Sequence, residues 1–319
     1  MAPPRLFPYW LLTTRSSLVS MPRPLAVALL VITTMLWGFA FVAQKSAMDA
    51  MGPLTFSAVR YLLGSLAILP LVLWELRRTG ARLERKDWGV VAIIAIAFFL
   101  GVTLQQIGLT VTTVTNGGFL TSLYVLFVPL LALVVFFQKP HPIVWVGVPM
   151  ALLGVYLLNG GRLDGFNIGD LLVVGSAVAW AVQVYLIGTV SKRTGLPVTI
   201  SVICFVTTAV LSGIGAPIFE TPNLAAIGTG WIEILYAGLL STAVAFTLQA
   251  VAQQYVPPAN AAIILSAEGL FAALGGALIL GERLPMVGYA GAALIFLAIV
   301  MVELVPALRQ RNAPPVLKQ

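Results

Sequence analysis

Long apolar runs recur along the whole chain, and two of them combine membrane length with polar residues in their interiors. These runs, 112–138 and 255–281, start 143 positions apart. Within the first run, Thr121 and Tyr124 are three positions apart, a spacing that places both on one face of a helix. The second run contains Glu268. Two such helices at a fixed separation predict two halves that face each other across a cavity.

Apolar runs long enough to cross a bilayer define the fold class. A helix of about 20 apolar residues spans a bilayer, and the chain offers ten such runs. Only 9% of its residues are charged and 60% are hydrophobic, whereas soluble domains carry about 25% charge. We therefore expect an all-α integral membrane protein. The predicted spans are 25–44, 54–74, 88–108, 114–137, 143–159, 168–187, 197–217, 231–251, 257–280 and 286–302.

The two halves of the chain align without gaps at the separation of 143 residues. Aligned pairs of residue types that are uncommon in apolar helices are Trp37 with Trp180, Gln106 with Gln249, and Pro142 with Pro285. Five spans per half is an odd number, so the second half enters the membrane from the opposite side. Inverted repeats of this kind build two related gates around a central site. The sequence predicts two inverted five-helix repeats around a central cavity.

Four segments follow from this division. The first repeat is expected at 22–160 and the second at 161–305, with a cytoplasmic tail at 306–319. A polar segment occupies 1–21, and translation from Met21 instead of Met1 would leave most of it out.

The distribution of lysine and arginine predicts the orientation. With both termini in the cytoplasm, 14 of these residues lie on the inside and 3 on the outside, and Arg60 lies within a span. Cytoplasmic loops are the ones enriched in positive charge. We therefore expect a multi-pass protein of the inner membrane with both termini cytoplasmic, and the lipid bilayer as its surroundings.

Arg60 and Glu268 are the two ionisable residues placed well inside predicted spans. Ionisable side chains at membrane depth are costly and usually face a cavity or a partner. Two interpretations stay open. The residues pair with each other or with backbone carbonyls, or they present charge to a polar solute. Both hold together if a substrate competes for the pair.

Stripes of amide, hydroxyl and aromatic side chains lie on six of the predicted helices. Lipid offers amides no hydrogen bonds, so these groups should point inward, either to bond neighbouring helices or to line a shared cavity. We favour the cavity. The expected substrate-binding residues are Trp37, Phe41, Gln44, Arg60, Gln106, Thr121, Tyr124, Trp180, Gln183, Thr242, Gln249 and Glu268.

The fifth and tenth predicted helices carry small residues and few polar groups, exemplified by Gly147, Gly154 and Gly291. Small residues let helices approach closely, so we expect packing between these helices or a homodimer formed through them. Catalytic and phosphate-binding motifs are missing from the sequence, and one cysteine and one histidine leave little for metal chemistry. We expect no enzyme activity, no cofactor and no nucleic-acid partner.

Three stretches resemble a known family. WGFAFVAQK at 37–45 and GPLTFSAVRYLLGSLAIL at 52–69 are similar to the opening helices of EamA-like permeases, and SAEGLFAALGGALILGERL at 266–284 resembles their ninth helix. The resemblance covers about residues 24–305 and extends to the drug/metabolite transporter superfamily. It implies an inner-membrane carrier of small metabolites, often amino acids or related compounds, commonly in export. Gly269 stands where the family pattern has proline, which leaves a kink there without its usual cause.

Three hypotheses for function follow. The first is a secondary transporter that moves a small polar or amphipathic metabolite, an amino acid or related compound, by alternating access and in the direction of export. The second is a passive facilitator or channel of the same fold. The third is a membrane-embedded lipid-modifying enzyme, which the scarcity of His, Cys and paired acids disfavours.

Overall fold

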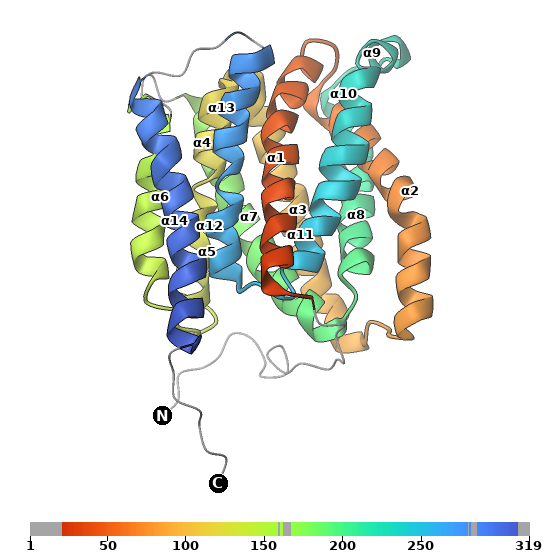
Figure 1. Cartoon of the computed structure of the whole chain (residues 1–319). Coiled ribbons are helices and arrows are strands. Elements are labelled where there is room, and N and C mark those ends of the chain that lie inside the picture. Colours follow the sequence, from red (N-terminus) through yellow and green to blue (C-terminus); the bar gives the residue numbers. More distant parts are fainter. Residues whose placement is uncertain (1–20, 159, 162–166, 280, 282–285, 312–319) are drawn as a thin grey trace.

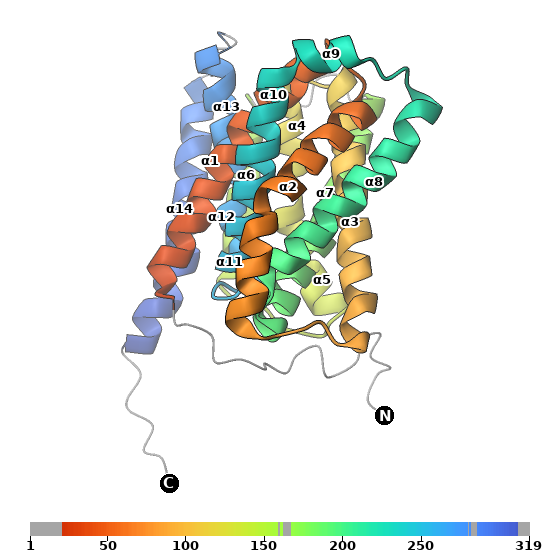
Figure 2. The ribbon, with the colours of Figure 1, turned by 90° about the vertical axis from the view of Figure 1, so that its right-hand side faces the viewer.

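The protein is a single bundle of helices. The structure, a computed structural model, describes residues 21–158, 160–161, 167–279, 281 and 286–311. Every regular element in these ranges is a helix, and the long helices stand side by side (Figure 1; Figure 2). This confirms the expected all-α class. Most of the predicted polar segment 1–21 and the last part of the tail, 312–319, lie outside the described residues.

Within the described ranges, nine helical segments are long and apolar enough to cross a membrane. They match nine of the predicted spans, and most of their first and last residues differ from the predicted ones by only a few positions. The predicted fifth span appears as the shorter apolar helix α6 (Val144–Leu158), so the ten-span count stays a prediction. Six spans are single helices: α1 (Arg23–Ala47), α2 (Pro53–Thr79), α3 (Arg85–Val111), α7 (Ile168–Thr194), α8 (Pro197–Phe219) and α14 (Met286–Arg311).

Three spans are built from more than one element. They are α4 (Val114–Thr121) with α5 (Tyr124–Val134), α10 (Trp231–Leu235) with the π-helix η2 (Tyr236–Phe246) and α11 (Thr247–Ala252), and α12 (Pro258–Leu265) with α13 (Glu268–Ile279). A short helix, α9 (Leu224–Thr229), precedes α10. The start of α1 and the end of α14 lie at the same end of the bundle (Figure 1). We call this the terminal end and the other the opposite end.

The α4–α5 and α12–α13 spans are interrupted at corresponding places, and the two interruptions touch. Ser122 Oγ donates to the Gly118 carbonyl at 2.8 Å, and Ser266 Oγ donates to the Ile263 carbonyl at 2.7 Å. Ser122 Oγ also lies 3.4 Å from the Ser266 carbonyl oxygen. Serine hydroxyls that bond back to the helix compete with its backbone hydrogen bonds. The ninth span is therefore broken even though Gly269 stands where the family pattern has proline.

At the terminal end, the last turn of α2 caps the first turn of α8. The Glu75 carboxylate accepts hydrogen bonds from Val198 N at 2.9 Å, Thr199 N at 2.8 Å and Thr199 Oγ1 at 2.7 Å. The first N–H groups of a helix lack partners within it and carry partial positive charge. A carboxylate from the neighbouring helix satisfies both needs.

At the opposite end, the roles of α2 and α8 are exchanged. Glu220, which directly follows α8, accepts from Leu54 N at 2.6 Å, Thr55 N at 2.9 Å and Thr55 Oγ1 at 2.6 Å. The carboxylate lies so close to Gly52 that a Cβ atom there would come within 2.3 Å of Glu220 Cδ. Glycine at this position therefore makes room for the cap.

The two caps repeat the same arrangement under the internal repeat. Thr55 and Thr199 are 144 positions apart, and Glu75 and Glu220 are 145 apart, close to the separation of 143 that aligns the halves. Each helix caps the other at opposite ends of an antiparallel pair. An inverted repeat predicts this relation.

Helices α6 and α14, the fifth and tenth predicted helices, pack against each other. A Cβ atom at Gly154 would come within 2.8 Å of the Gly291 carbonyl oxygen, so these backbones are in close contact. The packing interpretation thus accounts for their small residues. Their outward faces keep exposed apolar side chains such as Leu153 and Phe296, and a homodimer through them stays a prediction.

We predict that Glu75→Ala and Glu220→Ala each lower the stability of the protein. Each removes a charged acceptor of three hydrogen bonds, and hydrogen bonds to charged groups contribute about 1.5–3 kcal/mol each at most. We expect a loss of roughly 1–3 kcal/mol per variant, measured by thermal unfolding in detergent. Glu233→Ala, which removes an acidic side chain from the first turn of α10, is the control. Unchanged unfolding temperatures for both cap variants would contradict the prediction.

Candidate functional site

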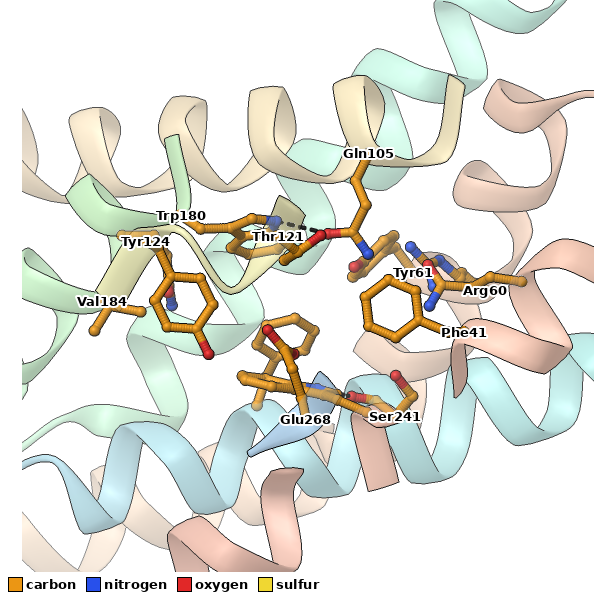
Figure 3. A pocket seen from close by; sticks show the side chains of 14 residues that line it. Phe41, Arg60, Tyr61, Gln105, Thr121, Tyr124, Trp180, Val184, Ser241 and Glu268 are labelled. Atoms are coloured by element: carbon orange, nitrogen blue, oxygen red, sulfur yellow. Dashed lines mark hydrogen bonds between the residues drawn. The ribbon is translucent and has the colours of Figure 1, made fainter. Parts of the chain in front are cut away.

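A small polar cavity lies in the middle of the bundle, between helices from both halves of the chain (Figure 3). Its free space is about 40 Å³, measured at the centres of water-sized spheres. One water molecule needs about 10–15 Å³ by this measure, so the cavity has room for a few waters. Side chains must move before it admits a metabolite.

Most of the expected binding residues meet in this cavity. Those that line it are Trp37, Phe41 and Gln44 of α1, Arg60 of α2, Thr121 of α4, Tyr124 of α5, Trp180 and Gln183 of α7, and Glu268 of α13.

The two tryptophans that the repeat aligns lie on either side of Phe246. The Trp37 ring centroid is 4.5 Å from that of Phe246, and the Trp180 ring stacks on Phe246 at 5.7 Å. Both indoles are oriented by hydrogen bonds, from Trp37 Nε1 to the Ser241 carbonyl at 3.1 Å and from Trp180 Nε1 to Gln105 Oε1 at 2.7 Å. Buried indoles usually find such a partner. The cavity thus has a fixed aromatic wall.

Arg60 and Glu268 bring charge into the cavity from separate helices (Figure 3). Their exposed fractions are 3% and 4%. The Arg60 guanidinium lies over the rings of Phe56 at 5.1 Å and Tyr61 at 4.7 Å. The Tyr124 hydroxyl lies beside the Glu268 carboxylate. No ion pair between Arg60 and Glu268 is present in the described part of the chain, so direct pairing does not explain their burial.

Gln106, Thr242 and Gln249 lie outside the cavity lining. Gln106 Nε2 donates to the Gln44 carbonyl at 3.2 Å. The amides of Gln249 and Gln183 bond each other at 3.3 and 3.4 Å. Thr242 packs beside α2, where a Cβ atom on the glycine at position 64 would come within 2.5 Å of its Cγ2 atom. The helix-to-helix interpretation suits these three residues.

The sequence stripe on the eighth predicted span runs through the π-helix η2. Thr242 and Phe246 are four positions apart and would share a face of an α-helix. In a π-helix the hydrogen bonds run from i to i+5, so the chain turns less per residue than in an α-helix and side chains point in directions that a period of 3.6 does not give. Ser241 and Phe246 are five apart, and both line the cavity. Nothing in the residue pattern announces the π-helix.

Sequence reasoning also left Gln105 and Tyr61 out of the expected set, although both line the cavity. A signal for Gln105 was available. Phe98 and Gly101 precede it at spacings of seven and four, and this face of α3 meets Trp180. The Phe98 and Trp180 ring centroids are 5.3 Å apart, and a Cβ atom at Gly101 would lie 3.0 Å from the indole.

The described residues contain no group of three or more His, Cys, Asp or Glu side chains that could hold a metal ion. What the cavity offers is a guanidinium, a carboxyl group, amides, hydroxyls and aromatic rings. This set is suited to binding a small organic solute.

The fold and this cavity define the class: a polytopic helical membrane protein with an enclosed polar site between its halves. The profile of the EamA-like transporter family matches the chain twice, at residues 24–160 and 167–304. The protein therefore belongs to the EamA-like transporter family, within the drug/metabolite transporter superfamily.

Similar proteins agree with this assignment. An uncharacterized transporter of Archaeoglobus fulgidus is 34% identical over 86% of this chain and 84% of its own length. The threonine/homoserine exporter RhtA of Escherichia coli is 27% identical over 81% of this chain and 84% of its own. A protein of known crystal structure with 18% identity superposes with a TM-score of 0.73, over 92% of this chain and 100% of that one. At that identity the likeness concerns the fold.

We predict opposite effects of alanine at two glycines of α3. Gly101→Ala forces a methyl group against the Trp180 ring, and overpacking typically costs about 1–3 kcal/mol. Gly89 has no atom within 4 Å of a built Cβ, so Gly89→Ala should be neutral or stabilising by up to about 1 kcal/mol, the difference in helix propensity. Thermal unfolding followed by tryptophan fluorescence measures both. Equal changes in unfolding temperature for the two variants would show that the Trp180 ring leaves room for a methyl group at Gly101.

Proposed function

We propose that the protein is a secondary transporter that moves a small polar or amphipathic metabolite by alternating access. One observation carries this proposal: a cavity that holds a guanidinium and a carboxyl group lies between the two halves of the bundle, and almost all of its lining residues are buried. Enclosure suits a carrier, which exposes its site to one side at a time. A channel would need a continuous path.

Contacts between helices close the bundle on both sides of the cavity. At the terminal end, Arg193 of α7 and Asp87 of α3 form a buried ion pair at 2.6 Å. Both residues belong to the wall of a hollow of about 810 Å³ at that end. At the opposite end, Lys45 Nζ donates to the Leu109 carbonyl at 2.8 Å and the Thr112 carbonyl at 3.0 Å. Breaking one set at a time would open one side.

An amino acid or related compound is the substrate class that we propose, with export as the direction. The name of the relative RhtA, a threonine/homoserine exporter, supports both. The excess of lysine and arginine at the terminal end of the bundle supports a cytoplasmic location of both termini in the inner membrane. The repeated caps of α2 and α8 support the inverted five-helix repeats.

We predict that cavity variants lose transport while the protein stays folded. Purified protein in liposomes should move at least one solute from a panel of amino acids and their derivatives. Trp180→Ala and Glu268→Gln should each lower the flux by roughly tenfold or more, since each removes an interaction of about 1.4 kcal/mol or more. Trp88→Ala, at a tryptophan 53% exposed and far from the lining, is the control. Loss of folding in both cavity variants would point to a structural role.

We predict trans-stimulation, which separates a carrier from a passive facilitator. A carrier that returns loaded exchanges labelled solute faster when unlabelled solute waits on the other side. Liposomes preloaded with the transported solute should therefore accumulate label transiently above equilibrium. If the label inside the liposomes never exceeds its equilibrium level, whatever the concentration of preloaded solute, the result would favour the facilitator or channel.

A further inference from the structure

Arg60 and Glu268 differ from the other buried charges. Six charged side chains are buried among the described residues. The other four have charged or hydrogen-bonding partners from a different helix: Glu75 caps α8, Asp87 pairs with Arg193, and Asp170 bonds Thr112.

In contrast, Arg60 Nε and Glu268 Oε1 have no hydrogen-bond partner in the described part of the chain. Arginine keeps its charge in proteins, and a buried charge without a partner is costly. Each of the other four buried charged side chains has a partner on another helix, whereas Arg60 and Glu268 line the cavity, where a ligand can reach them. Both side chains reach the same cavity (Figure 3).

We infer that the cavity binds a small zwitterion, with its anionic group on Arg60 and its cationic group on Glu268. This inference rests on the proposed transport function and assigns the two groups that would select the substrate. A carboxylate matches the donor fork of a guanidinium, and an ammonium group matches a carboxylate acceptor. A ligand with one charge leaves the other protein charge unsatisfied.

The geometry around each charge supports separate roles. The guanidinium of Arg60 lies over the Phe56 and Tyr61 rings, and these contacts use none of its N–H donors. Glu268 has the hydroxyl of Tyr124 beside it, and it lies in the first turn of α13. The two charges therefore arrive from α2 and α13 and need no contact with each other.

The uncharged remainder of the ligand meets rings. Trp37, Phe41 and Phe246 line the cavity together with the two charges, and the indoles are held by the hydrogen bonds described above. Rings held in this way favour a flat or apolar group over a third charge. Neutral amino acids fit this description, whereas amino acids with a charged side chain do not.

The decisive experiment compares ligands that lack one charge. Binding of L-threonine, L-leucine and L-phenylalanine to purified full-length protein is measured by isothermal titration calorimetry. The best of the three is then compared with its amide, which lacks the carboxylate, and its N-acetyl derivative, which lacks the ammonium group. Loss of one charge-assisted contact should weaken binding by roughly 10- to 100-fold in each case.

Two variants assign each charge to its residue. In Arg60→Gln, the amino acid and its amide should bind with the same, reduced affinity. The N-acetyl derivative should still bind more weakly than the amino acid. In Glu268→Gln, the amino acid and its N-acetyl derivative should bind with the same affinity. The amide should still bind more weakly than the amino acid. The matched variants Arg60→Lys and Glu268→Asp keep the charge and should retain both preferences. The wild-type comparison needs no variant, so misfolding of a variant leaves the test intact.

Three outcomes would overturn the inference. The wild-type protein binds the amino acid and one of the derivatives equally well, or it binds none of the three amino acids. In the third, Arg60→Gln abolishes the preference over the N-acetyl derivative and Glu268→Gln abolishes the preference over the amide. If one of these outcomes is found and liposomes still show flux of a singly charged solute, the proposed transport function stands. Only the inference that the cavity binds a zwitterion is then rejected. Absence of flux for every solute would instead remove the transport proposal.

Discussion

Backbone groups at helix ends lack partners within their own helix, and side chains from neighbouring helices that cap them help to hold the bundle together. Glu75 and Glu220 supply acceptors to the first turns of α8 and α2. Lys45 supplies a donor to the last carbonyls of α3. Each of these side chains belongs to a different helix from the one it caps. Satisfying the backbone therefore also ties the helices together.

The scaffold follows the repeat more closely than the cavity does. The caps of α2 and α8 recur under the repeat, and so do the interruptions at Ser122 and Ser266 and the tryptophans at 37 and 180. The charges do not recur, because Ile203 is aligned with Arg60. The π-helix η2 is likewise aligned with a part of α3 that is entirely α-helical. Substitutions of single residues therefore make the cavity asymmetric without changing the arrangement of the helices.

The spans and the internal repeat could be predicted from the sequence because both depend on local or regularly spaced properties. Apolar length gave the helix positions, and Trp37 with Trp180 gave the register of the halves. The caps could not be predicted, because Glu75 and Val198 are far apart in sequence and each looks like an ordinary loop-flanking residue. A period of 3.6 places Thr242 on the cavity face of its helix, but Thr242 lies in the π-helix η2, whose period differs. The sequence does not distinguish Gln105 from its neighbour Gln106, because adjacent residues on a helix point in different directions and only the contact with Trp180 shows which of them reaches the cavity.

The interrupted spans explain how a charged residue can be placed in the middle of an apolar bundle. The break after α12 makes Glu268 the first residue of α13, and the start of a helix carries partial positive charge that favours a carboxylate. The break after α4 likewise makes Tyr124 the first residue of α5, and its hydroxyl lies beside Glu268. Broken helices of transporters present their half-helix ends to a central site in this way. The serine hydroxyls bond back to the helix at the two breaks, and the breaks place the starts of α5 and α13 beside the cavity.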